Sequence, residues 1–213
     1  MARNSRSSRR KPMLCGLIDV GRFDLAHLRH LPAVGESLDA LWLRGPMLTY
    51  DEWLTWGTTI RELVPSVPLW IGGHIRAAQA LQASGLQWPA RCAWTKHRTM
   101  AWRGPVVASI HSLSEFEERQ EADGFVWGHA FASRSKPGLM PRSRASLEEI
   151  LKRTAKPVLA IGGINAHTVC DVVSWGVAGV VVGDGIWQQS QPEHAAAAIK
   201  KVWTQRKGDI IRW

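Results

Sequence analysis

The chain has 213 residues, of which 45% are hydrophobic and 21% are charged, and its formal net charge is +9 at pH 7. This composition is typical of a globular protein, and no apolar run approaches the length of a membrane span or a signal-peptide core. Cys15, Cys92 and Cys170 match neither a zinc spacing nor a disulfide framework, so we expect a reducing, cytoplasmic location.

The first 12 residues differ in composition from the rest of the chain. Five basic residues lie there among serines, at Arg3, Arg6, Arg9, Arg10 and Lys11. Because such a segment cannot bury apolar area, we expect a disordered basic tail over residues 1–12 and one folded domain over residues 13–213. A basic tail can touch nucleic acid non-specifically, but a solvated tail without a specific partner is the preferred interpretation.

Eight short apolar runs recur along the rest of the chain, each bounded by polar or amphipathic segments. Their length and composition are typical of strands that are buried on both faces. The runs are Met13 to Val20, Ala40 to Leu43, Leu69 to Ile71, Gly85 to Trp88, Val106 to Ile110, Phe125 to Trp127, Val158 to Ile161 and Gly179 to Val182.

Helical patterns fill most of the gaps between these runs. Ser114 and Ser146 each begin a Ser-x-x-Glu capping box, whereas Arg91 to Arg103 has no clear pattern. Alternating strands and helices predict a parallel sheet, and eight strands in a chain of this length favour a closed (β/α)8 TIM barrel over an open doubly wound sheet. The expected helices are Asp24 to Leu31, Asp51 to Leu63, Ile75 to Ala83, Ser114 to about Glu121, one from Ser146, Thr168 to Trp175 and Pro192 to Gln205.

Two glycine turns follow the last two expected strands. Gly162 and Gly163 come directly after the seventh strand, and Gly183-Asp184-Gly185 comes after the eighth. Glycine lets backbone N–H groups approach an anion, and in (β/α)8 barrels these two loops often hold a phosphate. The sequence therefore predicts a phosphate site at the four glycines. Because a carboxylate beside a phosphate is repelled, we expect the Asp184 side chain to point away or to cap a helix.

Three more residues follow strand ends, where barrel enzymes build their active sites. His129 ends the sixth run, and an imidazole there can exchange protons at neutral pH, although its position fits a hydrogen-bonded structural histidine equally well. Lys136 follows in a polar loop and is either a phosphate contact or a surface lysine. Arg44, at the end of the second run, offers forked donors to a carboxylate or phosphate.

Four segments resemble one protein family. They read A-S-I-H-S-L-S-E at residues 108–115, W-G-H-A-F at 127–131, S-K-P-G at 135–138 and P-V-L-A-I-G-G-I at 157–164. Together they resemble the thiamine phosphate synthase/TenI superfamily, strongly from Val106 to Ile186 and weakly through Leu41 to Arg44 and Leu69 to Gly73. The fold of that superfamily is a (β/α)8 barrel, which is also the fold that the strand count predicts.

Within this superfamily, the resemblance favours the TenI-like thiazole tautomerases over the synthases. A synthase joins a pyrimidine pyrophosphate to a thiazole phosphate with magnesium, and its pattern has Asn-Asp after strand three and another aspartate after strand four. Gly72-Gly73 and Pro89-Ala90-Arg91 occupy those places here, and Gly45-Pro46 follows Arg44 where synthases usually have Arg-x-Lys. Magnesium needs carboxylate oxygens to bridge to a pyrophosphate, so we expect no metal site.

The resemblance thus implies an isomerase that needs neither a metal nor an organic cofactor. Its reaction aromatises a carboxylated thiazole phosphate by a proton shift, and the Gly-His-x-Phe motif places the role of proton carrier on His129. The resemblance further implies that Lys136 and the four glycines hold the substrate phosphate and that Arg44 binds the remaining negative charge. His111 matches the family pattern after strand five, and we expect it to support the site structurally.

Two other functions stay open. A thiamine phosphate synthase, which is a transferase, would require magnesium. A non-catalytic binding or regulatory protein that reuses the barrel would bind DNA in a salt-sensitive way through its basic tail. For the isomerase, the expected partners are a small anionic thiazole phosphate and further copies of the same chain, because related proteins commonly self-associate. We expect neither membrane association nor specific nucleic-acid binding.

Overall fold

The computed structural model describes residues 13–94 and 101–210, with side chains described as far as residue 205. Eight parallel strands pair in chain order, and β1 also pairs with β8, so the sheet closes into a barrel. The strands are β1 (Met13–Asp19), β2 (Ala40–Arg44), β3 (Leu69–Gly72), β4 (Gly85–Trp88), β5 (Val106–Ile110), β6 (Gly124–Gly128), β7 (Val158–Ile161) and β8 (Gly179–Val182).

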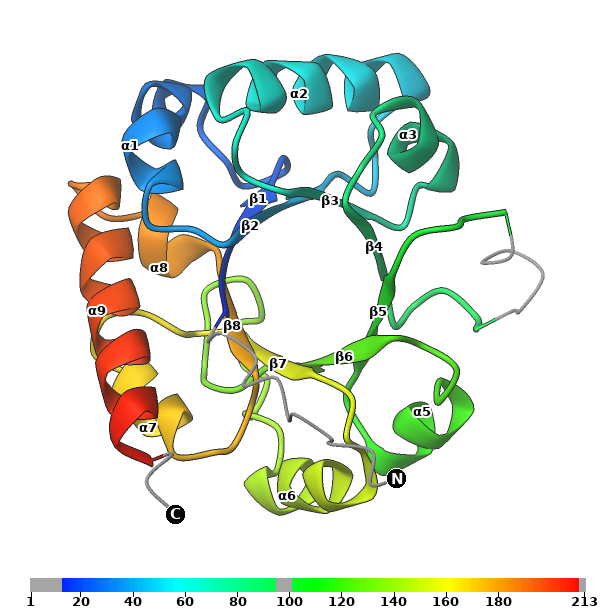
Figure 1. The fold of residues 1–213 in the computed structure, drawn as a ribbon, viewed down its shortest axis with the longest axis vertical. Coiled ribbons are helices and arrows are strands. Elements are labelled where there is room, and N and C mark those ends of the chain that lie inside the picture. The colour runs from blue at the N-terminus through cyan, green and yellow to red at the C-terminus, as the bar shows by residue number, and fades with distance from the viewer. Residues whose placement is uncertain (1–12, 95–100, 211–213) are drawn as a thin grey trace, which may run out of the picture.

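Helices form a ring outside the barrel (Figure 1). None of the helices in the described part of the chain is long and apolar enough to cross a membrane. They are the 3-10 helix η1 (Leu25–His30), α1 (Leu31–Gly35), α2 (Tyr50–Leu63), α3 (Ile75–Ala80), α5 (Leu113–Glu118), α6 (Arg144–Arg153), α7 (Val169–Val173), α8 (Asp184–Trp187) and α9 (Pro192–Ile210).

The structure confirms the predicted (β/α)8 barrel. Four strands have the expected bounds, and the other four differ by one residue at one or both ends. Between β4 and β5, where the sequence has no clear pattern, the described residues contain no helix. The basic tail predicted for residues 1–12 lies outside the described residues.

Two helix starts differ from the sequence prediction. At α5, the Ser112 hydroxyl accepts a hydrogen bond from the Glu115 backbone N–H at 3.2 Å, so the cap lies two residues before Ser114. The two Ser-x-x-Glu patterns overlap, and the end of β5 at Ile110 leaves room only for the earlier one. At α6, the helix begins at Arg144 and makes no side-chain cap, so Ser146 lies inside the first turn.

Two hydrophobic cores fill the molecule, because side chains on a strand alternate between its two faces. On β1, Leu14 belongs to the core between barrel and helices, whereas Cys15 belongs to a second core formed by strand residues. In that second core the rings of Trp42 and Trp70 stack at 6.0 Å between centroids. This core fills the barrel interior, so a ligand can reach the barrel only at its ends.

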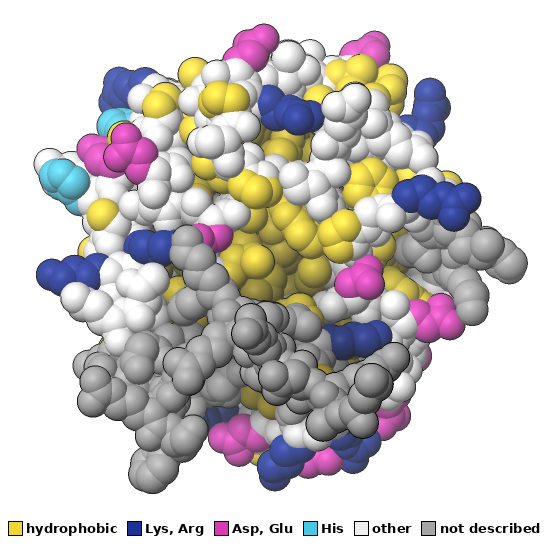
Figure 2. Space-filling view, in the orientation of Figure 1, with side chains coloured by type: hydrophobic (Ala, Val, Ile, Leu, Met, Phe, Trp, Pro, Cys, Tyr) yellow, Lys and Arg dark blue, Asp and Glu magenta, His cyan; other side chains and the backbone are white. Residues whose placement is uncertain are grey.

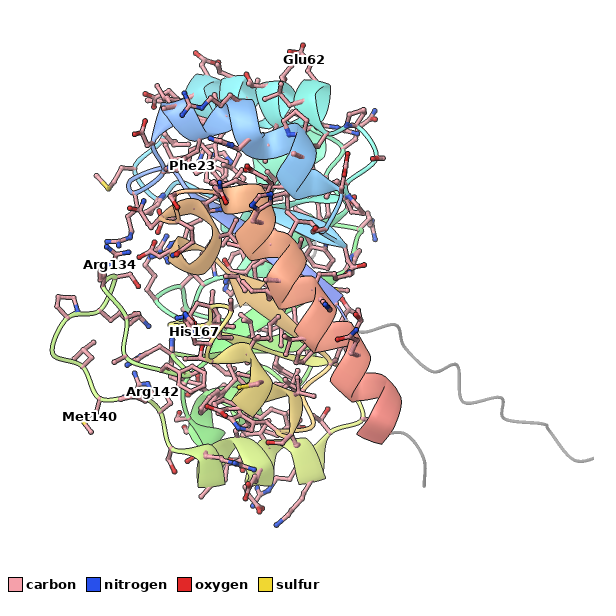
Figure 3. All side chains as sticks on the ribbon, turned by 90° about the vertical axis from the view of Figure 1, so that its left-hand side faces the viewer. Phe23, Glu62, Arg134, Met140, Arg142 and His167 are labelled. Atoms are coloured by element: carbon pink, nitrogen blue, oxygen red, sulfur yellow. The ribbon has the colours of Figure 1, made fainter. Side chains whose placement is uncertain are left out.

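The two ends of the barrel differ. At the carboxyl ends of the strands, the loop between β6 and α6 projects beyond the barrel and carries Arg134 and Met140, on the left in Figure 3. Figure 2 shows the opposite end, where hydrophobic side chains gather at the centre and charged side chains lie around the edge. The polar loops at the carboxyl ends therefore offer the better place for a charged ligand.

Candidate functional site

A cavity of about 320 Å³ opens at the carboxyl ends of the strands. Residues from the ends of six strands and from the loop after β6 line it. The parallel barrel brings these residues together because it places every strand's carboxyl end on the same side. All eight residues singled out from the sequence line this one cavity: Arg44, His111, His129, Lys136, Gly162, Gly163, Gly183 and Gly185.

Three of the four glycines are required by close backbone packing. Gly162 and Gly163 have positive φ angles of 101° and 67°. An added Cβ would lie 2.8 Å from the His129 Cα at Gly162 and 2.5 Å from the Ala132 carbonyl oxygen at Gly163. At Gly185 it would lie only 2.1 Å from a backbone carbonyl. The turns after β7 and β8 therefore present bare backbone to the cavity, as the sequence predicts.

The loop after β6 is anchored to the barrel by backbone hydrogen bonds. The Ala130 N–H donates to the Ile161 carbonyl at 2.8 Å, and the Phe131 N–H donates to the Gly162 carbonyl at 3.0 Å. Farther along, the Arg142 N–H returns to the His129 carbonyl at 3.0 Å. The loop therefore closes on itself at His129, which keeps Lys136 at the cavity wall.

The His129 ring is buried, with 2% of its surface exposed. Its Nε2 lies 3.3 Å from the Leu139 carbonyl oxygen, and because a carbonyl only accepts, Nε2 carries the hydrogen. Its Nδ1 is buried and has no hydrogen-bond partner within the described residues. The imidazole thus holds the loop in place and keeps one nitrogen unpaired.

His111 lies at the end of β5 and is held by Glu115 of α5. One Glu115 carboxylate oxygen accepts the His111 backbone N–H at 2.5 Å and lies 3.1 Å from the ring Nδ1. Burial lowers the pKa of His111, and Lys136 and Arg142 lower it further, although Glu115 acts in the opposite direction. Because His111 lines the cavity itself, its purely structural role stays a prediction.

Cationic side chains outnumber acidic ones in the cavity wall. Four basic residues line it, against two acidic ones, Asp19 and Asp184. Burial lowers the pKa of Lys136, and the positive charges of Arg142 and Arg44 lower it further. This crowding of like charges shows a positive potential that favours an anionic ligand. The four basic residues are Arg22, Arg44, Arg134 and Lys136.

Asp184 lines the cavity, and no side chain caps α8, at whose start it lies. Its carboxylate accepts a hydrogen bond from the Arg22 guanidinium at 2.7 Å, and its orientation relative to a bound phosphate stays a prediction. Asp19 is paired similarly, with its carboxylate 3.6 Å from Arg44 Nη1. Neither Arg22 nor Asp19 is predicted as a site residue from the sequence. Asp19 could have been found by the strand-end rule, but the predicted first strand ran one residue too far.

The fold and the cavity define a (β/α)8-barrel protein with a basic, glycine-lined cavity at the carboxyl ends of its strands. Residues 25–186 match the TMP-TENI family model, which describes thiamine monophosphate synthase. The chain belongs to this family.

Several relatives of known name cover most of the chain. The thiamine-phosphate synthase of Pyrococcus abyssi is 30% identical over 151 residues, which are 68% of this chain and 73% of that protein. The thiamine-phosphate synthase of Chlorobium phaeobacteroides is 26% identical over 202 residues, or 90% and 96% of the two chains. The solved thiamine phosphate pyrophosphorylase of Pyrococcus furiosus has a TM-score of 0.81 at 22% identity and covers 93% of this chain and 98% of its own.

These relatives correct the main functional prediction. The two sequence relatives are named synthases, which are transferases, so the predicted thiazole tautomerase, an isomerase, is wrong. The prediction depends on the short Gly-His-x-Phe motif at His129 and on the missing synthase residues after strands two, three and four. That motif also suits a structural role, because the buried ring hydrogen-bonds the Leu139 carbonyl. The contribution of His129 to any reaction stays a prediction.

Magnesium, which the synthase pattern implies, does not fit the residues of this chain. No group of three or more His, Cys, Asp or Glu side chains that could hold a metal occurs within residues 13–94 and 101–205. Glycines end β3, and Pro89 and Ala90 follow β4, so the loops there lack carboxylates. The two cavity carboxylates, Asp19 and Asp184, already pair with guanidinium groups. Hard cations need free carboxylate oxygens, which this arrangement does not supply.

Proposed function

We propose that the protein is a transferase that makes thiamine phosphate from a pyrimidine pyrophosphate and a thiazole phosphate. Membership of the family and the names of the relatives support this reaction. The observation that carries the proposal is the cavity itself, in which four basic residues and four glycines converge. Its volume of about 320 Å³ lies within the range of small-molecule sites.

The cavity offers two kinds of phosphate contact. The glycine turns after β7 and β8 bring backbone N–H groups close to the cavity, and such turns bind phosphate without a side chain. Lys136 and Arg44 add positive charge from the loop after β6 and the end of β2. Two phosphorylated substrates require two such regions. We assign the thiazole phosphate to the glycine turns and the pyrophosphate to the basic side chains, Lys136 among them.

The transfer step needs a stabilised leaving group. The bond between the pyrimidine methylene carbon and the pyrophosphate oxygen breaks, and a bond forms from that carbon to the thiazole nitrogen. The electron pair of the broken bond stays on the pyrophosphate, so negative charge grows there as the reaction proceeds. Fixed cations next to the growing charge lower the barrier, and Arg22 and Arg44 line the cavity after β1 and at the end of β2.

A direct assay tests the proposal. Purified protein is incubated with both substrates, and thiamine phosphate and pyrophosphate are measured by chromatography. We expect equimolar formation of the two products, with kcat/KM reduced about tenfold in Lys136→Met. The control is Lys201→Met, on the exposed surface of α9, which we expect to match the wild type.

One outcome would contradict this function. If the protein binds both substrates but forms no thiamine phosphate with or without added magnesium, it is a non-catalytic binding protein. Isothermal titration with each substrate separately shows whether binding is intact.

A further inference from the structure

We propose that the guanidinium and ammonium groups of the cavity, led by Arg22 and Arg44, neutralise the pyrophosphate group in place of a divalent cation. This inference rests on the proposed function and names how its charged leaving group is bound. It follows from what the carboxylates of the cavity contact and from how the loop after β4 is held.

The loop after β4 is organised around an arginine. Arg119 of the segment after α5 is buried, with 3% of its surface exposed. Its guanidinium donates hydrogen bonds to the backbone carbonyls of Pro89 at 3.3 Å, Ala90 at 2.9 Å and Cys92 at 3.2 Å. The place where the synthase pattern has a carboxylate is therefore occupied by backbone whose carbonyls already bind a cationic side chain.

Each of the two acidic residues that line the cavity forms an ion pair with an arginine that also lines it. Asp184 binds Arg22 at 2.7 Å, and Asp19 lies 3.6 Å from Arg44. A guanidinium has five N–H donors, so an arginine held by one carboxylate keeps donors for phosphate oxygens. A carboxylate, a guanidinium and a phosphate can thus form the same bridge that a carboxylate, a metal ion and a phosphate form elsewhere.

The remaining charge in the cavity matches a polyanion. After Arg22 and Arg44 are offset by the two aspartates, Lys136 and Arg134 remain as surplus cations in the wall. Arg142 is close enough to act electrostatically on Lys136, and Figure 3 shows it on the same side of the molecule as Arg134. The basic residues of the cavity wall therefore come from three segments: the loop after β1, the end of β2 and the loop after β6. This arrangement suits a pyrophosphate, which carries several negative charges, better than a singly charged group.

Pyrophosphate binding without metal tests this inference. Inorganic pyrophosphate is titrated calorimetrically into protein in EDTA and, separately, in excess magnesium. We expect the dissociation constant in EDTA to be no more than about threefold weaker than in magnesium. Arg22→Met and Arg44→Met should each weaken binding in EDTA about tenfold or more. Both side chains are exposed, so the variants should fold, which thermal unfolding verifies.

Arg29→Met provides a matched control, because Arg29 is exposed on η1, does not line the cavity and contacts only the neighbouring His30 among the hydrogen bonds of the described residues. Binding by this variant should equal that of the wild type. The inference is overturned if wild-type protein binds pyrophosphate only with magnesium, or if both cavity variants bind it as the wild type does.

The turnover assay separates the two proposals. If thiamine phosphate forms only with magnesium, the transferase function holds and the replacement of the metal by arginines fails. If pyrophosphate binds in EDTA but no product forms under any condition, the cationic site holds and the transferase function fails.

Discussion

Lys136 is one of the cavity residues whose protonation depends on its surroundings. Burial lowers its pKa from the ordinary 10.5, and Arg142 and Arg44 add to the effect. The folded protein therefore binds this proton less tightly than the unfolded chain does. Below the lowered pKa the charge destabilises the fold. This penalty shrinks as the pH rises above the lowered pKa, and it is absent above the ordinary 10.5. An anion beside the ammonium group has the opposite effect, because it favours the charged form.

The substitution Lys136→Met should therefore separate binding from stability. At pH 7 we expect pyrophosphate affinity to fall about tenfold, while the melting temperature without ligand does not fall. In the wild type, affinity should decrease as the pH rises through the lowered pKa, at a pH below 10.5, and the variant should lack this step. Calorimetric titration across pH measures the first effect, and thermal unfolding measures the second.

Lys201→Met is the control for both measurements, since Lys201 lies exposed on α9, away from the cavity wall. A variant Lys136→Met that binds pyrophosphate as tightly as the wild type would show that this lysine does not contact the anion.

At the scale of single residues, the sequence predicts which residues line the cavity where they follow the end of a strand. His129, Lys136 and the four glycines line it for this reason, because residues after the carboxyl ends of parallel strands lie on the same side of the barrel. The pair Arg22–Asp184 was not found, because its partners are 162 positions apart and no local pattern links them. The function is mispredicted for a related reason: a four-residue motif at His129 and a few departures from the synthase pattern outweigh the similarity that the rest of the chain shares with synthases.

At the scale of elements, the start of α2 shows how a cap defines a helix. The Thr49 hydroxyl accepts the Glu52 backbone N–H at 3.3 Å, and the Glu52 carboxylate accepts the Thr49 backbone N–H at 2.7 Å. These two bonds form a complete capping box, so the helix begins at Tyr50 and not at the predicted Asp51. The orphan N–H groups of the first turn are satisfied without help from other elements.

Removing the Thr49 hydroxyl should destabilise the first turn of α2. Thr49→Ala should lower the free energy of unfolding by about 1 kcal/mol, because the first turn loses its cap. Chemical denaturation measures the change. Thr58→Ala, at an exposed position of the same helix, is the matched control, and it should be neutral or slightly stabilising because alanine favours helix. Equal losses in both variants would mean that the hydroxyl cap contributes nothing.

The capping box also predicts that the stability of the fold depends on pH. Hydrogen bonds from the Thr49 backbone N–H and hydroxyl hold the pKa of Glu52 below its ordinary 4.5. Because the folded pKa is lowered, this stabilisation is present above pH 4.5 and is lost as the pH falls through the lowered value. The stability advantage of wild type over Glu52→Gln should therefore shrink in acid.

Strands were easier to predict than helix starts. A strand buried on both faces is a continuous apolar run, and all eight runs became strands with bounds within one residue. Helix starts depend on which of several nearby polar side chains reaches a backbone N–H. Ser112 and Ser114 both fit the capping pattern, and only the position of β5 decides between them.

For the whole molecule, closure of the barrel joins the first and last parts of the chain. Met13 to Gly16 of β1 pair with Gly179 to Val182 of β8. Beside this seam, Asp39 accepts the Leu14 backbone N–H at 2.8 Å and forms an ion pair with Lys200 of α9. The carboxylate therefore connects the first strand, the start of the second and the last helix.

Lys200→Met should consequently destabilise the whole fold, since it removes the charged partner of a largely buried carboxylate. The Lys200 side chain is 22% exposed and that of Asp39 is 17% exposed, so the pair lies between surface and core. We therefore expect the free energy of unfolding to fall by about 2 kcal/mol and the melting temperature to fall by about 4–8 °C. Thermal unfolding measures this against Lys201→Met, whose neighbouring exposed side chain gives the same change of charge. If both variants melt at the same temperature, the ion pair does not stabilise the closure of the barrel.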